Sequence, residues 1–570
     1  MSALPAPVTP DGATRLDGLV HAAEGRVSGG LSPIAQGLAL LDWGVHLANA
    51  PFRRVELATQ AFWVAARMGE AARGATVIEP APTDHRFQDP QWREPPFHAL
   101  MQAFLLGEQW WADATDGPSG VNAADRRVIA FSVRQWVDMF SPSNAPWLNP
   151  EVLRSAQETG GGNFLVGAAN AVADLRAAIG VRHDQEPFQV GRDLAATPGA
   201  VVYRNDLIEL IQYAPTTKDV AREPVLIVPA WIMKYYILDL RPENSLIRYL
   251  VDRGHTVFAI SWRNPTEQFR DYSLEDYRRQ GLMAALDAIG DICAGVKVNA
   301  VGYCLGGTLL AMGAAALGRA DDERLASVTL LCAQTDFTEA GELQLFITAD
   351  QLAFLDDVMR AQGYLDASQM AGAFQFLRSN DLFWSRLVKT YWLGKPEHSN
   401  DLMAWNADTT RMPARMHSEY LHKLFQHNEL AEGRYEVEGR PIALNDIRTP
   451  MFVLGTETDH IAPWRSVHKI HLLSPCEITF ALTSGGHNAG VVSPPGHPGR
   501  HFACLKRPAG GHYLGPDEWL AAAQKREGSW WPAWADWLDA HSTGRAPPPA
   551  MGSDKHPALD PAPGRYVLEK

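Results

Sequence analysis

The sequence predicts an α/β fold, in which a parallel sheet with helices between its strands follows a mostly helical region. Short apolar runs of strand length alternate with helical stretches from about residue 191 onward, as in Thr256–Trp262. One such run, Val298–Val301, leads through Gly302-Tyr303-Cys304-Leu305-Gly306 into a helix-forming segment. Before about residue 180, apolar residues instead recur at three- and four-residue spacing, which is typical of helices.

Composition narrows the function classes. The chain has 570 residues and a formal net charge of -14, which leaves room for two or more domains and argues against wholesale nucleic-acid binding. Its 5 cysteines include no C-x-x-C pair, so neither a disulfide framework nor a zinc site is expected, and a reducing cytoplasm fits. The N-terminus lacks a charged segment followed by an apolar run, and no secretory signal or transmembrane segment is expected.

The chain divides by composition into three parts. Residues 1–30 are rich in Pro, Gly and Ala and are expected to be disordered, and residues 31–190 are expected to form a helical domain without evident chemistry. Residues 191–570 carry the strand rhythm and form the catalytic domain. Within it, residues 335–440 lack that rhythm and are expected to form a lid insertion at the carboxyl edge of the sheet. The Pro-rich tail, 542–570, is expected to be loose or draped on the surface.

The turn around Cys304 has the pattern of a nucleophile elbow, G-x-S-x-G, with Cys in place of Ser. Gly302 and Gly306 would avoid collisions in a sharp strand-to-helix turn. The apex thiol would then lie at a helix N-terminus, which favours a thiolate. The alternative is an ordinary β-to-α turn with a buried cysteine, since Cys is among the most often buried residues.

A thiol nucleophile needs a base, and the base needs an orienting acid. Asp336 and Asp459 each follow a strand after the elbow, and the later position favours Asp459. His487 follows the last parallel strand on a Gly-rich loop and is the best-placed base. The other downstream histidines are expected to have packing or surface roles: His468, His471, His497, His501 and His512.

Acyl chemistry also needs an oxyanion site. One N–H group would come from Leu305, the residue after the nucleophile, and the other from the loop after an earlier strand, around Trp231.

Longer stretches resemble class I-type polyhydroxyalkanoate synthases, which are α/β-hydrolase-fold enzymes, over nearly the full length from about Ser32. The stretches that carry the resemblance are FQDPQW (87–92), FSPSNAPWLNPE (140–151), ETGGGN (158–163), VGRDLAATPGAVVYRNDLIELIQY (190–213), KYYILDLRPENSL (234–246), GHTVFAISWRNP (254–265), GYCLGG (302–307), WNADTTRMP (405–413), TDHIAPW (458–464) and GGHNAGVVSPPGHPGR (485–500). The family's catalytic Cys, Asp and His fall on Cys304, Asp459 and His487.

The resemblance implies polymerisation of (R)-3-hydroxyacyl-CoA through an acyl-cysteine, with CoA as leaving group and no retained cofactor or metal. It also implies a homodimer, in the cytoplasm at polyester granules. The stretches 229–234 and 485–488 depart from the family pattern, which leaves the acyl chain length open. Lys234 and Arg263 are candidates for contacts with the CoA phosphates.

Two other readings stay open. A Cys-dependent thioesterase or polyester depolymerase of the same fold would let water replace the hydroxyl acceptor. A scaffold protein that keeps the fold without activity would be expected to lack members of the triad.

Overall fold

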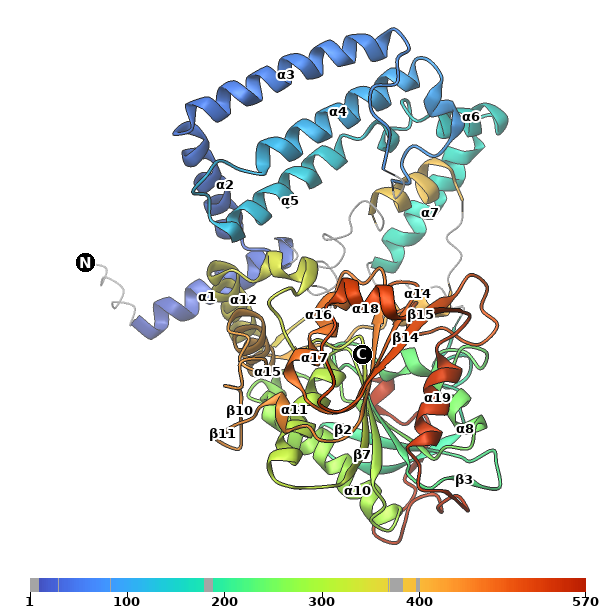
Figure 1. Ribbon diagram of the computed structural model, residues 1–570. Helices are drawn as coiled ribbons and strands as arrows, with labels where there is room; N and C mark the ends of the chain where they lie inside the picture. Colours follow the sequence, from blue (N-terminus) through green and yellow to red (C-terminus); the bar gives the residue numbers. More distant parts are fainter. Residues whose placement is uncertain are drawn as a thin grey trace, which may run out of the picture. The chain divides into compact units, whose positions relative to one another are not determined.

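The computed structural model describes residues 10–28, 30–81, 84–178, 188–366, 369, 383–395 and 400–570. They group into two compact units (Figure 1). The sheet unit comprises residues 1–24, 187–368 and 400–570, and the helical unit comprises residues 25–186 and 369–399. Segment 369–399 therefore groups with the helical unit, although the sequence placed it inside the insertion 335–440 of the catalytic domain.

Long helices make up most of the helical unit. They are α2 (Pro33–Ala48), α3 (Pro51–Ala72), α4 (Phe97–Thr115), α5 (Ala123–Met139), α6 (Pro150–Glu158) and α7 (Gly162–Ala178). The side chains of Ser32, Asn122 and Asn149 begin three of these helices by accepting hydrogen bonds from first-turn amides. α3 packs on α4, and α2 packs on α5.

The π-helix η8 (Leu387–Trp392) packs against α7. Asn163 Nδ2 donates to the carbonyl oxygen of Trp392 at 2.7 Å. A Cβ on Gly167 would lie 1.8 Å from the carbonyl oxygen of Tyr391, so only glycine permits this approach. These contacts explain why the segment joins the helical unit, which no local sequence pattern indicates.

Residues 10–28 form helix α1 (Pro10–Ser28), where the sequence predicted disorder over 1–30. His21 Nδ1 lies 2.9 Å from Asp357 Oδ2, and its ring contacts Phe354, both on α12 (Ala349–Gln362). The prediction was wrong for this helix because it rested on the composition of the segment, which does not reveal contacts with a distant helix such as α12. Residues 1–9 lie outside the described part of the chain.

One 11-stranded sheet forms the centre of the sheet unit, in the order β15-β14-β13-β12-β7-β6-β4-β5-β2-β1-β17. Its six central strands are parallel: β5 (Val257–Trp262), β4 (Val225–Val228), β6 (Val298–Tyr303), β7 (Leu325–Leu331), β12 (Met451–Thr456) and β13 (Ile478–Thr483). Every residue of β5, β4, β6, β12 and β13 is buried, as parallel strands covered on both faces require.

Antiparallel strands extend the sheet at both edges. They are β1 (Gly199–Arg204), β2 (Ile208–Tyr213) and β17 (Asp560–Pro561) on one side, and β14 (His501–Arg507) and β15 (Gln524–Glu527) on the other. β1 and β2 form a hairpin.

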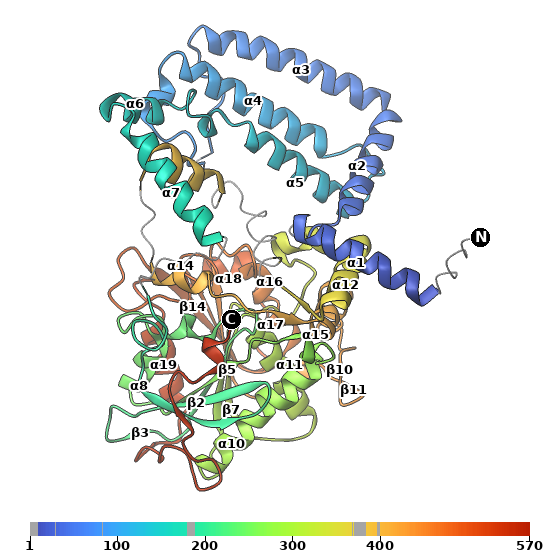
Figure 2. The ribbon, with the colours of Figure 1, turned by 180° about the vertical axis from the view of Figure 1, so that it is seen from behind.

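Helices cover both faces of the sheet. α10 (Ala284–Ile292) and α11 (Leu305–Arg319) lie on one face, and α8 (Leu246–Asp252) and α19 (Trp531–Ala540) lie on the other (Figure 2). On the α19 face, Trp530, Trp531 and Trp534 are fully buried in the main core, and Trp534 Nε1 donates to Thr329 Oγ1 at 3.0 Å. The predicted α/β-hydrolase architecture is confirmed.

The C-terminal tail lies along the surface of the sheet unit, which agrees with the second of the two alternatives predicted for it, loose or draped on the surface. β16 (Arg545–Ala546) pairs with β3 (Val220–Ala221), and β17 pairs with the edge strand β1. Val567 is buried. Proline is tolerated at a sheet edge, where no ladder partner needs its missing N–H, so a Pro-rich composition did not indicate a loose chain here.

The described part of the insertion within the sheet unit lies between β7 and β12. It contains η6 (Gly341–Phe346), α12, β8 (Tyr364–Leu365), α14 (Asp401–Asn406), β9 (Met412–Pro413), α15 (Ala414–Glu419), the π-helix η9 (Tyr420–Gln426), β10 (Glu436–Val437) and β11 (Arg440–Pro441).

Candidate active site

The turn between β6 and α11 holds Cys304 at its apex. β6 ends at Tyr303 and α11 begins at Leu305, and Cys304 has φ 52° and ψ -122°. A residue other than glycine rarely takes positive φ, and such strain persists only where the surrounding packing enforces it. The thiol is half-buried at the carboxyl edge of the sheet.

Glycines make this turn sterically possible. A Cβ on Gly306 would lie 2.1 Å from the carbonyl oxygen of Val228, and one on Gly302 would lie 2.3 Å from Gly307 Cα. A Cβ on Gly307 would lie 2.4 Å from Ala333 Cβ. The steric role predicted for Gly302 and Gly306 is confirmed by these distances.

Asp459 lies just past β12 and is buried. Its Oδ1 accepts hydrogen bonds from the backbone amides of Ile461 at 2.9 Å and Ala462 at 2.8 Å. Its Oδ2 accepts from Thr456 Oγ1 at 3.1 Å and lies 2.7 Å from His487 Nδ1. Burial acts to raise the pKa of Asp459, but the charge of His487 and these hydrogen bonds outweigh it and lower that pKa.

His487 lies on the loop after β13 and is buried. Because its Nδ1 faces Asp459, the other ring nitrogen is left for Cys304. Burial acts to lower the pKa of His487, but the charges of Cys304 and Asp459 outweigh it and raise that pKa to about 10. The ring therefore holds a proton at neutral pH.

The alternative acid, Asp336, lies elsewhere. Its Oδ1 accepts from the Thr338 amide at 2.9 Å and lies 3.6 Å from Lys469 Nζ. The structure thus brings Asp459, and not Asp336, to His487.

The other candidate histidines have separate surroundings. His468 and His471 are buried against Phe480 and each other, with ring centroids 4.6 Å apart. His501 Nε2 lies 3.0 Å from Glu457. His497 and His512 are exposed.

The loop after β4 lies beside the elbow, because Val228 is the register partner of Gly302. The start of this loop lies against Gly306, because a Cβ there would lie 2.5 Å from the carbonyl oxygen of Pro229. Leu305 is the first residue of α11, and its amide is not needed by the helix ladder. Thr410 Oγ1, from the insertion, donates to the carbonyl oxygen of Trp231 at 2.6 Å and fixes this loop.

Two residues near the site were missed in the sequence. Thr456 ends β12 and donates to Asp459, and Cys332 follows β7 with φ 49° and is buried. Neither belongs to a motif, since their positions depend on pairing between strands distant in sequence.

The two cations predicted to contact the CoA phosphates, Lys234 and Arg263, already contact other groups of the protein. Burial lowers the pKa of Lys234 to about 8, and its Nζ donates to the carbonyl oxygens of Tyr566 and Glu569 at 3.1 and 2.7 Å. Arg263 Nε lies 3.2 Å from Glu569 Oε1. Both cations hold the C-terminal tail.

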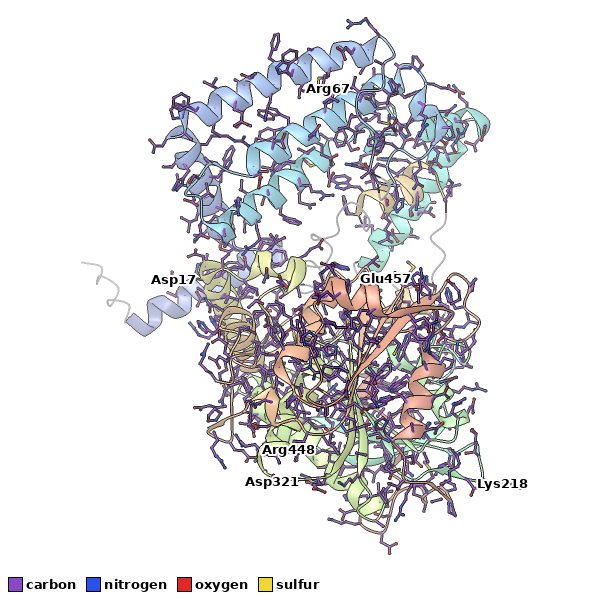
Figure 3. The ribbon with its side chains drawn as sticks, in the orientation of Figure 1. Asp17, Arg67, Lys218, Asp321, Arg448 and Glu457 are labelled. Carbon is purple, nitrogen blue, oxygen red and sulfur yellow. The ribbon has the colours of Figure 1, made fainter. Side chains whose placement is uncertain are left out.

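Labelled residues mark the two edges of the sheet in Figure 3. Glu457 follows β12 at the carboxyl edge, whereas Arg448, which precedes β12, lies 3.5 Å from Asp321 at the opposite edge. Cys304, Asp459 and His487 follow the ends of β6, β12 and β13, so the site lies at the carboxyl edge, where ligands bind in open α/β sheets.

A central parallel sheet, an elbow cysteine, and an acid and a histidine after later strands define an α/β-hydrolase-fold enzyme. Residues 223–494 match the family model of the α/β hydrolase fold. Residues 83–250 match the model described as poly-beta-hydroxybutyrate polymerase (PhaC) N-terminus, and residues 11–53 match poly-beta-hydroxybutyrate polymerase N terminal.

Curated relatives extend the match. The poly(3-hydroxyalkanoate) polymerase of Methylorubrum extorquens is 42% identical over 87% of this chain and 82% of its own length. The poly(3-hydroxyalkanoate) polymerase subunit PhaC of Cupriavidus necator is 36% identical over 85% of this chain and 83% of its own. The chain belongs to the poly(3-hydroxyalkanoate) polymerase family and is an enzyme of the acyltransferase class. Within its described residues, no helix is long and apolar enough to cross a membrane.

Proposed function

We propose that this enzyme polymerises (R)-3-hydroxyacyl groups from their CoA thioesters into polyhydroxyalkanoate, with Cys304 carrying the acyl chain. The observation that carries the proposal is the position of His487, whose Nδ1 lies 2.7 Å from Asp459 Oδ2 and whose pKa is raised by the charge of Cys304. The names of the relatives support polymerisation as the overall reaction.

In the acylation step, the Cys304 thiolate attacks the thioester carbonyl carbon. The amides of Leu305 and Trp231 donate to the oxyanion that forms. The carbon–sulfur bond to CoA then breaks, and protonated His487 gives its proton to the departing CoA sulfur. Exchange of one thioester for another is nearly isoenergetic, so the acyl group stays activated on Cys304.

In the elongation step, neutral His487 accepts the proton of a 3-hydroxyl group on a second acyl-CoA. The hydroxyl oxygen attacks the acyl-Cys304 carbonyl, the ester bond forms, and the Cys304 sulfur leaves as a thiolate beside protonated His487. The lengthened chain is again a CoA thioester and re-acylates Cys304 with release of CoA. CoA thus enters as part of the substrate and leaves as a product, and this scheme uses no retained cofactor or metal.

Assembly as a homodimer at polyester granules is part of the proposal. The helical unit exposes large apolar side chains on α3, with Phe52 88% and Phe62 69% exposed. Side chains of this kind suit an apolar surface. Co-sedimentation with polyester particles, with and without Phe52→Ser and Phe62→Ser together, tests this part; unchanged sedimentation of the double variant argues against it.

The test of the reaction is incubation with 3-hydroxybutyryl-CoA. Free thiol and product chain length are measured in the same sample. Thiol release with high-mass polyester is the expected result. Thiol release with free 3-hydroxybutyrate alone would show a thioesterase instead.

Variants test the assigned groups. Cys304→Ala and His487→Ala are expected to abolish thiol release, and Asp459→Asn to lower it in a folded protein. Turnover by Cys304→Ala would overturn the mechanism. A medium-chain acyl-CoA run in parallel separates a length preference from a lack of activity.

A further inference from the structure

Cys332 lies between the strands that carry the active-site groups. It directly follows β7, whose neighbours in the sheet are β6 and β12. Its amide donates to the carbonyl oxygen of Leu454 on β12 at 2.8 Å, and the Cys304 amide donates to that of Leu331 at 2.9 Å. Tyr303 and Leu331 are register partners, so the next residues on the two strands, Cys304 and Cys332, are neighbours.

The Cys332 thiol is buried against the acid–histidine pair. Its Sγ, a carboxylate oxygen of Asp459 and a ring nitrogen of His487 all lie within 4.8 Å of one another. In the part of the chain that the structure describes, this is the one group of three such side chains with metal-ligand separations. All three side chains are buried, so this cluster differs from the exposed groups of acids that are common at protein surfaces without an ion.

The three donor atoms are of the types that a borderline-soft cation prefers as ligands. A thiolate, an imidazole and a carboxylate are common Zn²⁺ ligands, at about 2.0–2.3 Å from the ion, whereas Mg²⁺ and Ca²⁺ prefer oxygen alone. Donors around a tetrahedral ion lie roughly 3.5 Å apart by that geometry. Side-chain movements on the order of 1 Å therefore bring the three atoms to a common ion, and a water molecule can complete the tetrahedron.

We propose that Cys332, Asp459 and His487 form an inhibitory site for a thiophilic divalent cation of the Zn²⁺ class. Binding displaces the Cys332 thiol proton and the His487 ring proton to solvent, so that a thiolate and a neutral ring bind the ion. The bound state is inactive because the metal occupies the acid–histidine pair that Cys304 needs for proton transfer. The loss of activity rests on the proposed function, whereas the binding itself does not.

No sequence spacing indicates this site. The ligands follow three different strands, β7, β12 and β13, and meet only because β7 and β13 flank β12 in the sheet. The absence of a C-x-x-C pair excludes a zinc ribbon or finger but not a site assembled in this way.

Direct binding is measured first, on the full chain freed of metal by a chelator. Co²⁺ is the probe, since a thiolate ligand produces a near-ultraviolet charge-transfer band. We expect one Co²⁺ per chain, displaced by Zn²⁺, and roughly tenfold or greater loss of affinity in Cys332→Ala. Cys293→Ala, at the half-buried end of α10, is the matched control and is expected to bind as the parent does.

Inhibition is measured second, with each variant compared to its own untreated rate. Zn²⁺ is expected to stop thiol release from 3-hydroxybutyryl-CoA, with recovery on chelation, and Cys332→Ala is expected to need at least tenfold more Zn²⁺. Cys332→Ser is measured too, with circular dichroism as the folding check, in case the alanine variant does not fold.

The outcomes separate the two proposals. Equal Co²⁺ affinity and equal Zn²⁺ sensitivity in the parent and the folded Cys332 variants would overturn the site, since the bound metal would then not need Cys332. Absence of Co²⁺ binding to the parent would also overturn it. Binding that depends on Cys332 in a chain without any acyltransferase activity would support the site and refute the proposed function.

Discussion

At the scale of single residues, the protonation state of His487 determines how Cys304 can react. A ring with a pKa raised to about 10 pairs with Asp459 and keeps Cys304 beside a positive charge. That arrangement suits a reaction in which Cys304 attacks first and His487 is needed as a base only in the later elongation step. The carboxylate is held in turn by four hydrogen-bond contacts, which fix the orientation of the ring.

Replacing Cys304 by Ala is expected to lower the pKa of His487 below about 10. The charge of Cys304 is the largest contribution that raises this pKa, so its removal leaves burial opposed by Asp459 alone. A pH titration of the ring by NMR, with ¹³C-labelled histidine, measures the shift. Cys293→Ala serves as control, and an unchanged pKa in Cys304→Ala would refute the contribution of Cys304 to the pKa of His487.

Replacing Thr456 by Val is expected to lower kcat by roughly tenfold, with little change in KM. The change removes the Oγ1 donor to Asp459 Oδ2, and a hydrogen bond to a charged group contributes about 1.5–3 kcal/mol. Thr479→Val is the matched control, because Thr479 is buried in β13 and its Oγ1 has no partner among the described residues. Equal kcat in the two variants would contradict the positioning role.

At the scale of helices and strands, the sequence predicted the features that depend on a few consecutive residues. The alternation of strands and helices, the glycine-flanked elbow, and Asp459 and His487 on loops after strands were all readable, because each depends on a few consecutive residues. Helix α1 and the π-helix η8 against α7 were not, because each depends on contacts with distant segments. Cys332 and Thr456 were missed for the same reason.

The steric role of Gly306 in the elbow can be tested by substitution. Gly306→Ala is expected to destabilise the sheet unit by at least about 1–3 kcal/mol and to abolish activity, because the new Cβ meets the backbone oxygens of Val228 and Pro229, which cannot yield. Gly290→Ala on α10 meets no atom within 4 Å and is expected to stabilise by about 0.4–1 kcal/mol. Urea unfolding compares the two; similar midpoints would refute the steric account.

For the whole molecule, chain order and spatial units do not coincide. The chain passes between the two units at residues 24/25, 186/187, 368/369 and 399/400, so neither unit is one continuous segment. No composition boundary reveals this, because residues 369–399 join the helical unit through tertiary contacts such as that of Asn163 with Trp392. The sheet unit also buries several neutral histidines, which link its stability to pH.

Acidification below pH 6.5 is expected to destabilise the sheet unit. Burial lowers the pKa of His468 to about 4 and those of His417 and His471 to about 3. Each lies below the unfolded value of about 6.5, so this stability is fully present above pH 6.5 and is lost as pH falls toward 3–4. At pH 5 the loss is about 2 kcal/mol for each histidine.

Urea unfolding at pH 7 and pH 5 measures this loss. His468→Phe keeps a ring among Phe480 and Trp519 but cannot take up a proton, so its loss on acidification is expected to be smaller than that of the parent by about 2 kcal/mol. His422→Phe is the control of opposite sign, because hydrogen bonds to Asp356 and Gln426 raise the pKa of His422 despite burial, and its stabilisation grows on acidification. Removing it should steepen the loss, and equal slopes in all three proteins would exclude the histidines as the cause.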